Sequence, residues 1–99
     1  MAGPVYKLWR VRFTEAWHQL SADEQQQLTT KVGGALEQVG AKALVFCNSA
    51  WSDEQWPVFG VEEFPDIEAV HKHIQLLQEL NWFRYIDSST TLGTRWELE

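Results

Sequence analysis

Residues 5–13 decide the fold, and they read Val5-Tyr6-Lys7-Leu8-Trp9-Arg10-Val11-Arg12-Phe13. Large apolar side chains alternate along this stretch, which is typical of a strand whose successive side chains point to opposite faces of a sheet. One face is apolar except for Lys7. The other face carries Arg10 and Arg12 among apolar residues. The pattern predicts a first strand over residues 5–13.

A connector of residues 14–20 and then a helix are predicted to follow. Ser21-Ala22-Asp23-Glu24 has the form of a capping box, in which the serine caps the helix and the glutamate reaches back to the serine. Apolar residues then recur every three or four positions and form one buried stripe: Leu28, Val32, Leu36 and Val39. Gly40 is expected to end the helix, and Gly33 and Gly34 to let it approach the sheet closely.

The second half of the chain repeats this order. Residues 42–51 and 56–64 predict two strands, joined by the four-residue polar turn Ser52-Asp53-Glu54-Gln55. A second helix begins at Pro65 and Asp66, with Asp66 as its cap. Its buried stripe is Ile67, Val70, Ile74, Leu77 and Leu80. Residues 82–86 predict a fourth strand, and residues 87–99 an extended arm.

The order strand, helix, strand, strand, helix, strand is that of the ferredoxin-like α+β fold, βαββαβ. We therefore expect residues 1–99 to form a single domain, with a four-stranded antiparallel sheet and two helices on one face. This arrangement leaves the other face of the sheet bare. What covers that face bears directly on function.

Charge and composition exclude several classes of function. The formal net charge is −6 and the eight Lys and Arg residues are scattered, which argues against nucleic acid or an anionic membrane as a partner. No apolar run approaches the roughly 20 residues that a membrane span requires, and the first residues lack the apolar core of a signal peptide. With the single Cys47, these features predict a cytoplasmic protein.

Arg10 and Arg12 are candidate functional residues because they lie on a strand that should be central in the sheet. If both faces of that strand are covered, at least one arginine is buried and needs an anionic partner. Glu62, on a neighbouring strand, is the expected partner. Such a pair can be purely structural, and the alternative is an arginine that orients a carboxylate or enolate ligand.

Two histidines are candidate general bases, since histidine titrates near neutral pH. His18 lies in the connector beside Trp17, and His73 lies beside the stripe of the second helix, where it can face a cavity. Each can instead be an exposed histidine. His71 and His73 point about 200° apart on a helix and cannot share a metal ion. No metal site and no cofactor are predicted.

Gly60 lies in the middle of the predicted third strand, where glycine often marks a close approach to the backbone. With Trp56 and Glu62 on the same face, it can open a pocket or make room for a neighbouring tryptophan. Tyr85, on the predicted fourth strand, can hydrogen-bond a ligand or pack. Six tryptophans in 99 residues favour aromatic pockets or interfaces.

The order of elements and the aromatic, alternating strands resemble the dimeric α+β barrel superfamily, which includes the Dabb proteins, the antibiotic-biosynthesis monooxygenases and the EthD-like proteins. The segments Trp17-x-x-Leu20-Ser21-x-x-Glu24 and Trp82-Phe83-x-Tyr85 are similar to those of darcynin-like proteins. The resemblance implies a homodimer that pairs its bare sheet faces. It also implies a small apolar cavity, of the kind that cofactor-free oxygenases, cyclases, lyases and isomerases use.

The leading hypothesis is a homodimeric barrel that binds a small apolar or aromatic ligand and acts on it by acid–base chemistry. In it, His18 or His73 carries the proton, Arg10 or Arg12 stabilises an anion, and Glu62 and Tyr85 orient them. The alternative is a non-catalytic ligand-binding or interaction module. A second alternative is a haem-binding or metal-binding protein.

Overall fold

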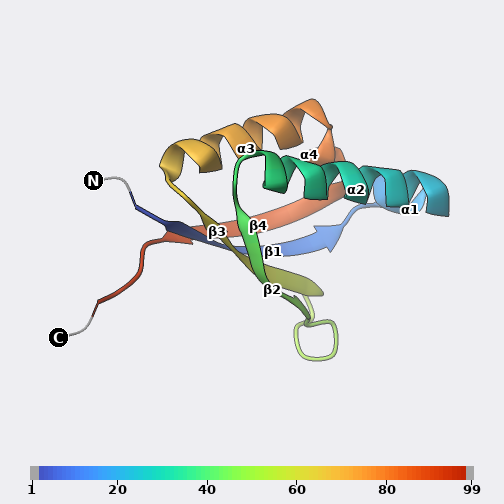
Figure 1. Cartoon of the computed structure of the whole chain (residues 1–99). Coiled ribbons are helices and arrows are strands. Elements are labelled where there is room, and N and C mark those ends of the chain that lie inside the picture. The colour runs from blue at the N-terminus through green and yellow to red at the C-terminus, as the bar shows by residue number, and fades with distance from the viewer. Residues whose placement is uncertain (1–2, 98–99) are drawn as a thin grey trace.

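The structure is a computed structural model that describes residues 3–97, and it confirms the ferredoxin-like α+β fold (Figure 1). Four strands form an antiparallel sheet in the order β2-β3-β1-β4. They are β1 (Val5–Phe13), β2 (Lys42–Asn48), β3 (Val58–Phe64) and β4 (Ile86–Gly93). Two long helices, α2 (Ala22–Gln38) and α3 (Ile67–Glu79), lie over one face of the sheet, and the short helices are α1 (Glu15–His18) and α4 (Trp82–Tyr85).

Local sequence signals set the ends of both long helices. Ser21 and Glu24 form the predicted capping box: the Ser21 hydroxyl accepts from the Glu24 N–H at 3.1 Å, and the Glu24 carboxylate accepts from the Ser21 N–H at 2.8 Å. Asp66 caps α3 by accepting from the Ala69 N–H at 2.8 Å. After α2, Gly40 adopts a φ of 76°, a left-handed conformation that glycine reaches without steric cost.

The tightest packing lies at one end of the molecule. Phe64 and Val70 are fully buried there and bring β3 against α3. The cluster is completed by residues from β1, α2 and the segment after it: Val5, Leu36 and Ala41. Away from this end, α2 and the sheet are less closely packed, and Leu28 and Val32 of the predicted stripe are only half-buried.

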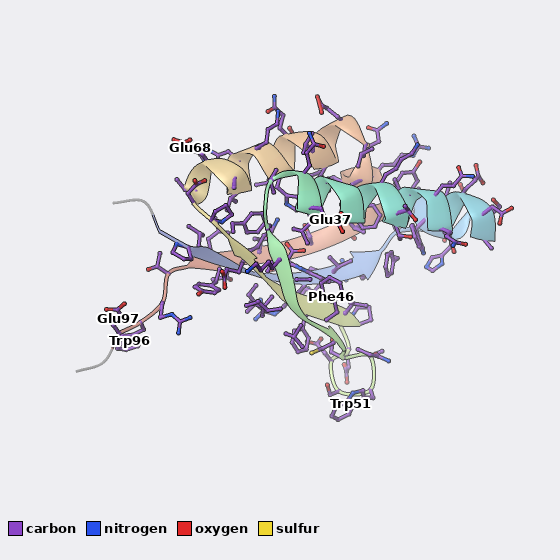
Figure 2. The ribbon with its side chains drawn as sticks, viewed as in Figure 1. Glu37, Phe46, Trp51, Glu68, Trp96 and Glu97 are labelled. Carbon is purple, nitrogen blue, oxygen red and sulfur yellow. The ribbon has the colours of Figure 1, made fainter. Side chains whose placement is uncertain are left out.

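The predicted four-residue turn between the second and third strands is wrong. β2 ends at Asn48, and residues 49–57 form a longer loop with its own hydrogen bonds. The Ser49 hydroxyl donates to the Trp56 carbonyl at 2.6 Å, and the Asp53 carboxylate accepts from two backbone N–H groups at 2.8 Å. Trp51, at the outer end of this loop, is 85% exposed (Figure 2).

The predicted fourth strand over residues 82–86 is also wrong. Residues 82–85 form α4 after Asn81, which adopts a left-handed conformation with a φ of 58°. Tyr85 therefore lies on a helix and not on a strand. The true β4 begins at Ile86 and pairs with β1 along its whole length, from Phe13↔Ile86 to Tyr6↔Gly93. The strand thus occupies part of the predicted extended arm, and residues 98–99 of that arm lie outside the described residues.

The glycines of α2 do not have the role that the sequence predicts. A Cβ atom added at Gly33 or Gly34 would meet no other atom within 4 Å, so neither glycine marks a close approach to the sheet. Gly60 does mark one. A Cβ there would lie 2.5 Å from the ring of Trp9 and 2.8 Å from that of Phe46. The interpretation that Gly60 makes room for a tryptophan is therefore correct.

None of the helices within residues 3–97 combines the length and the apolar character that crossing a bilayer requires.

We predict that Gly60→Ala destabilises the protein, because the added methyl group overlaps the Trp9 ring. Overpacking of this kind typically costs about 1–3 kcal/mol. Gly34→Ala is the matched control, since it adds the same methyl group in open space on α2 and should stabilise the helix by up to about 1 kcal/mol. Urea unfolding measures both. Equal stability of the two variants would contradict the close contact at Gly60.

Candidate functional site

A cavity of about 290 Å³ lies between the helices and the sheet. Its walls come from the helix-facing side of β1, β3 and β4, from Phe46 of β2, and from all helices except α1. Most of the lining side chains are apolar: Trp9, Val11, Phe13, Val32, Leu36, Phe46, Val58, Leu77, Trp82, Phe83 and Ile86. A largely apolar cavity with a few polar groups is the usual form of a small-molecule site, and this one is near the lower end of the common size range of about 300–1,000 Å³.

Three ionisable side chains lie on the cavity wall although all are buried. Lys7 is 6% exposed, Glu62 8% and His73 3%. They come from β1, β3 and α3. Since ionisable side chains are rarely buried unless they are paired, the arrangement of these three groups decides what the site can do.

Lys7 and Glu62 are directly opposite each other in the β1–β3 register. They do not form a close ion pair, because the only ion pair shorter than 4.0 Å within residues 3–97 joins Arg12 to Asp87. Burial lowers the pKa of Lys7, and the charge of Glu62 opposes that change. Burial raises the pKa of Glu62, and Lys7 and the indole of Trp9 oppose that rise. Each group is therefore shifted toward its neutral form.

His73 is held in its neutral form more strongly. Burial, and to a lesser extent the charge of Lys7, lower the pKa of His73 to about 4. Its ring packs against Phe64 with the ring centroids 5.3 Å apart, and the Lys7 ammonium lies 5.9 Å from the centre of the same Phe64 ring. His73 is therefore neutral at neutral pH, and its low pKa makes it a weaker base than an ordinary histidine.

Two buried nitrogen atoms have no hydrogen-bond partner within the described part of the chain: Nδ1 of His73 and Nε1 of Trp9. The Trp9 indole lies near enough to Glu62 to lower its pKa, but the two groups do not meet the geometry of a hydrogen bond. Unpartnered polar atoms in a protein interior are rare and costly. Both atoms belong to residues that line the cavity.

Arg10 and Arg12 lie on the opposite face of the sheet from this cavity. In β1 they alternate with the helix-facing residues, so the predicted Arg–Glu62 pair is wrong. Arg12 instead pairs with Asp87 at 3.2 Å and lies 5.4 Å from the centre of the Trp56 ring. Both side chains of that ion pair are about half exposed, and such pairs contribute little to stability.

The remaining predicted site residues also lie away from the three ionisable groups. His18 is exposed at the end of α1. Trp56 lies in the loop before β3, and Tyr85 is half-buried at the end of α4. None of these three lines the cavity. Of the predicted set, the structure brings together Glu62 and His73, with Gly60 beneath Trp9.

Lys7 is the site residue that the sequence interpretation missed. The sequence does contain a signal for it, since Lys7 is the one charged residue on the otherwise apolar face of the first strand.

Within residues 3–97 no group of three or more His, Cys, Asp or Glu side chains is arranged to hold a metal ion.

We predict that His73 makes folding stability depend on pH between about 6.5 and 4. The unfolded chain binds a proton near pH 6.5 and the folded protein only near pH 4, so stability falls as the pH falls through this window, by roughly 1–2 kcal/mol between pH 7 and 5. His73→Phe, which keeps an aromatic ring against Phe64, should remove this part of the dependence. Urea unfolding at both pH values measures it, and the same slope in both proteins would contradict a neutral, buried His73.

Comparison of sequences finds no match among curated proteins. Solved structures are similar in fold. A protein of unknown function from Rhodopseudomonas palustris, RPA0582, superposes with a TM-score of 0.72 at 19% identity, over 99% of this chain and 86% of that one. The chlorite dismutase of Candidatus Nitrospira defluvii, in complex with imidazole, gives a TM-score of 0.75 at 18% identity, over 94% of this chain.

This chain spans only 40% of the chlorite dismutase chain. At these identities the likeness shows a shared ferredoxin-like α+β fold and nothing about activity. The model of a protein family matches residues 5–99, which is nearly the whole sequence. The chain therefore belongs to the family of unknown function DUF6616.

Proposed function

We propose that the protein binds a small apolar or aromatic molecule in the cavity between its helices and its sheet. The observation that carries this proposal is a mostly apolar cavity of about 290 Å³ with three buried ionisable side chains on its wall and no close ion pair among them. A ligand with an aromatic ring and one polar end matches such walls. Its ring would pack against Trp9 and Trp82, and its polar end would meet Lys7, Glu62 and His73.

The same groups support acid–base chemistry on the bound molecule, without a cofactor. His73 lines the cavity and is neutral at physiological pH, so its ring is a proton acceptor within reach of a bound ligand, although a pKa of about 4 makes it a weak base. Glu62 holds its proton more tightly than an ordinary glutamate and can return one. Arg10 and Arg12 lie on the other face and cannot take the anion-stabilising role that the sequence gives them, and Lys7 is the basic residue on the cavity wall.

Non-catalytic binding is the alternative, and it uses the same cavity. The two functions differ in whether a bound ligand is converted into a product. An enzyme is favoured if the native protein turns the ligand over while His73→Phe still binds the ligand but no longer converts it.

A haem or metal site is the second alternative. A purified protein with visible absorbance or bound metal would favour it, and His73 would then be the cavity histidine available as a ligand.

We also propose that the protein is a homodimer, paired through the sheet face that no helix covers, like the dimeric α+β barrels that its sequence resembles. On this face the centre is apolar, with Leu8 of β1 beside Val61 of β3. Charges of both signs flank it, including Arg10 and Glu63. A patch that combines an apolar centre with both charges can be self-complementary about a two-fold axis. Burial of this face would complete the barrel.

We predict that Gly33→Leu abolishes ligand binding. Gly33 lines the cavity and has open space at its Cβ position, so a leucine fills the cavity from α2 without backbone strain. Gly34→Leu is the matched control, because it adds the same side chain one position along the helix and away from the cavity. Tryptophan fluorescence and the melting temperature in the presence of small aromatic compounds report binding.

The proposal expects binding to the native protein and to Gly34→Leu, and none to Gly33→Leu. Equal binding to all three proteins would place the ligand elsewhere and contradict it.

We predict that Val61→Lys converts the dimer to a monomer, because it places an unpaired charge at the apolar centre of each face. Ile67→Lys is the control, since it replaces an exposed apolar residue at the start of α3, on the helix side of the molecule. Light scattering at micromolar concentration measures the mass of each protein. A monomeric native protein would overturn this part of the proposal.

A further inference from the structure

The surroundings of Lys7 do little to stabilise the charged form of its side chain. It lies in β1 at the covered face of the sheet, 6% exposed, and takes part in no ion pair shorter than 4.0 Å among residues 3–97. Its nearest carboxylate partner in register is Glu62, and its ammonium lies over the Phe64 ring at 5.9 Å. The side chain lines the cavity, so a bound ligand can reach it.

We propose that Lys7 is a nucleophile that forms a Schiff base with the carbonyl carbon of an aldehyde or ketone bound in the cavity. This inference rests on the proposed function, because it names the class of ligand that the same cavity takes and the atom to which the ligand becomes attached.

The apolar walls around Lys7 favour a neutral carbonyl compound over a carboxylate. Moving a carboxylate from water into such surroundings is costly. An aldehyde or ketone enters uncharged. The amine that attacks it must be unprotonated, and the burial that lowers the pKa of Lys7 increases that fraction.

The reaction balances with groups already on the cavity wall. The Lys7 amine forms a C–N bond to the carbonyl carbon and gives a carbinolamine. Glu62, whose pKa is raised by burial, donates a proton to the hydroxyl group, the C–O bond breaks and water leaves. The product is an iminium of Lys7, one water and the Glu62 carboxylate, with no change of oxidation state.

Reductive trapping tests this inference on the intact protein. Benzaldehyde with cyanoborohydride converts an imine into a stable benzyl-lysine, which peptide mass mapping locates. Lys31, Lys42 and Lys72 are exposed and serve as internal references. We expect Lys7 to be labelled faster than each reference, because burial in the cavity wall leaves a larger fraction of its amine unprotonated.

Variants connect the labelling to the cavity. Lys7→Arg keeps the positive charge and should lose the benzyl group at position 7, while the three reference lysines react as before. Gly33→Leu retains Lys7 but fills the cavity, and should slow labelling of Lys7 to the rate of the references. Gly34→Leu should label like the native protein. Labelling of Lys7 no faster than the references, or unchanged labelling in Gly33→Leu, would overturn the inference.

Benzyl alcohol separates this inference from the proposed function, because it has the same ring but no carbonyl group. If benzyl alcohol raises the melting temperature of the native protein but not of Gly33→Leu, the cavity binds aromatic ligands. Failure of benzaldehyde to label Lys7 would then overturn the Schiff base alone. If neither compound binds and Lys7 is not labelled, both proposals fail. Protection of Lys7 from benzaldehyde by benzyl alcohol is the result that supports both.

Discussion

The pairing of β1 with β3 sets Lys7 opposite Glu62 on the face of the sheet that α2 and α3 cover. Antiparallel pairing fixes which residues face each other, and a shift of either strand by one position would send its side chain to the other face and separate the two. The helices then remove these groups from water, and His73 of α3 joins them. Every perturbed property of the cavity follows from this constraint: a lysine and a histidine whose pKa values are lowered and a glutamate whose pKa is raised.

Charged residues on the two faces of the sheet differ in their exposure and in their ion pairing. On the face without helices, Arg12 is half exposed and pairs with Asp87 while resting on the ring of Trp56, so its charge is satisfied locally. On the covered face, Lys7 and Glu62 oppose each other without a close contact, and the space beside them is not filled by side chains. Groups that are buried, shifted and unpaired are typical of functional sites more than of structural ones. This contrast favours the cavity, and not the arginines, as the candidate functional site.

The sequence predicts those features that depend on neighbours along the chain. The Ser21–Glu24 capping box, the Asp66 cap and the alternation of residues 5–13 are local, and the structure confirms all three. The fourth strand depends on pairing with β1, and its Ser and Thr residues carry a weaker signal than the aromatic run of residues 82–85, which forms α4. That competition explains the misplaced strand.

The site was predictable only in part for a related reason. Glu62 and His73 stand out from the sequence, but their partner depends on the register between β1 and β3, which periodicity alone does not give. The predicted partner of Glu62 is therefore an arginine from the wrong face, and Lys7 is predicted only as an exception on an apolar face. The open space beneath α2 is also not predictable, because Gly33 suggests close packing where the structure has a cavity.

Tryptophan side-chain NMR tests the central claim, that this cavity is a ligand site, most directly. Each indole N–H of a ¹⁵N-labelled sample gives its own signal, assigned by substitution. The Trp9 N–H is buried in the cavity wall without a partner among residues 3–97, whereas Trp51 and Trp96 are 85% and 83% exposed (Figure 2). On titration with a small aromatic ligand, the account predicts that the Trp9 signal moves while those of Trp51 and Trp96 do not. Movement of the two exposed signals with Trp9 unchanged would contradict it.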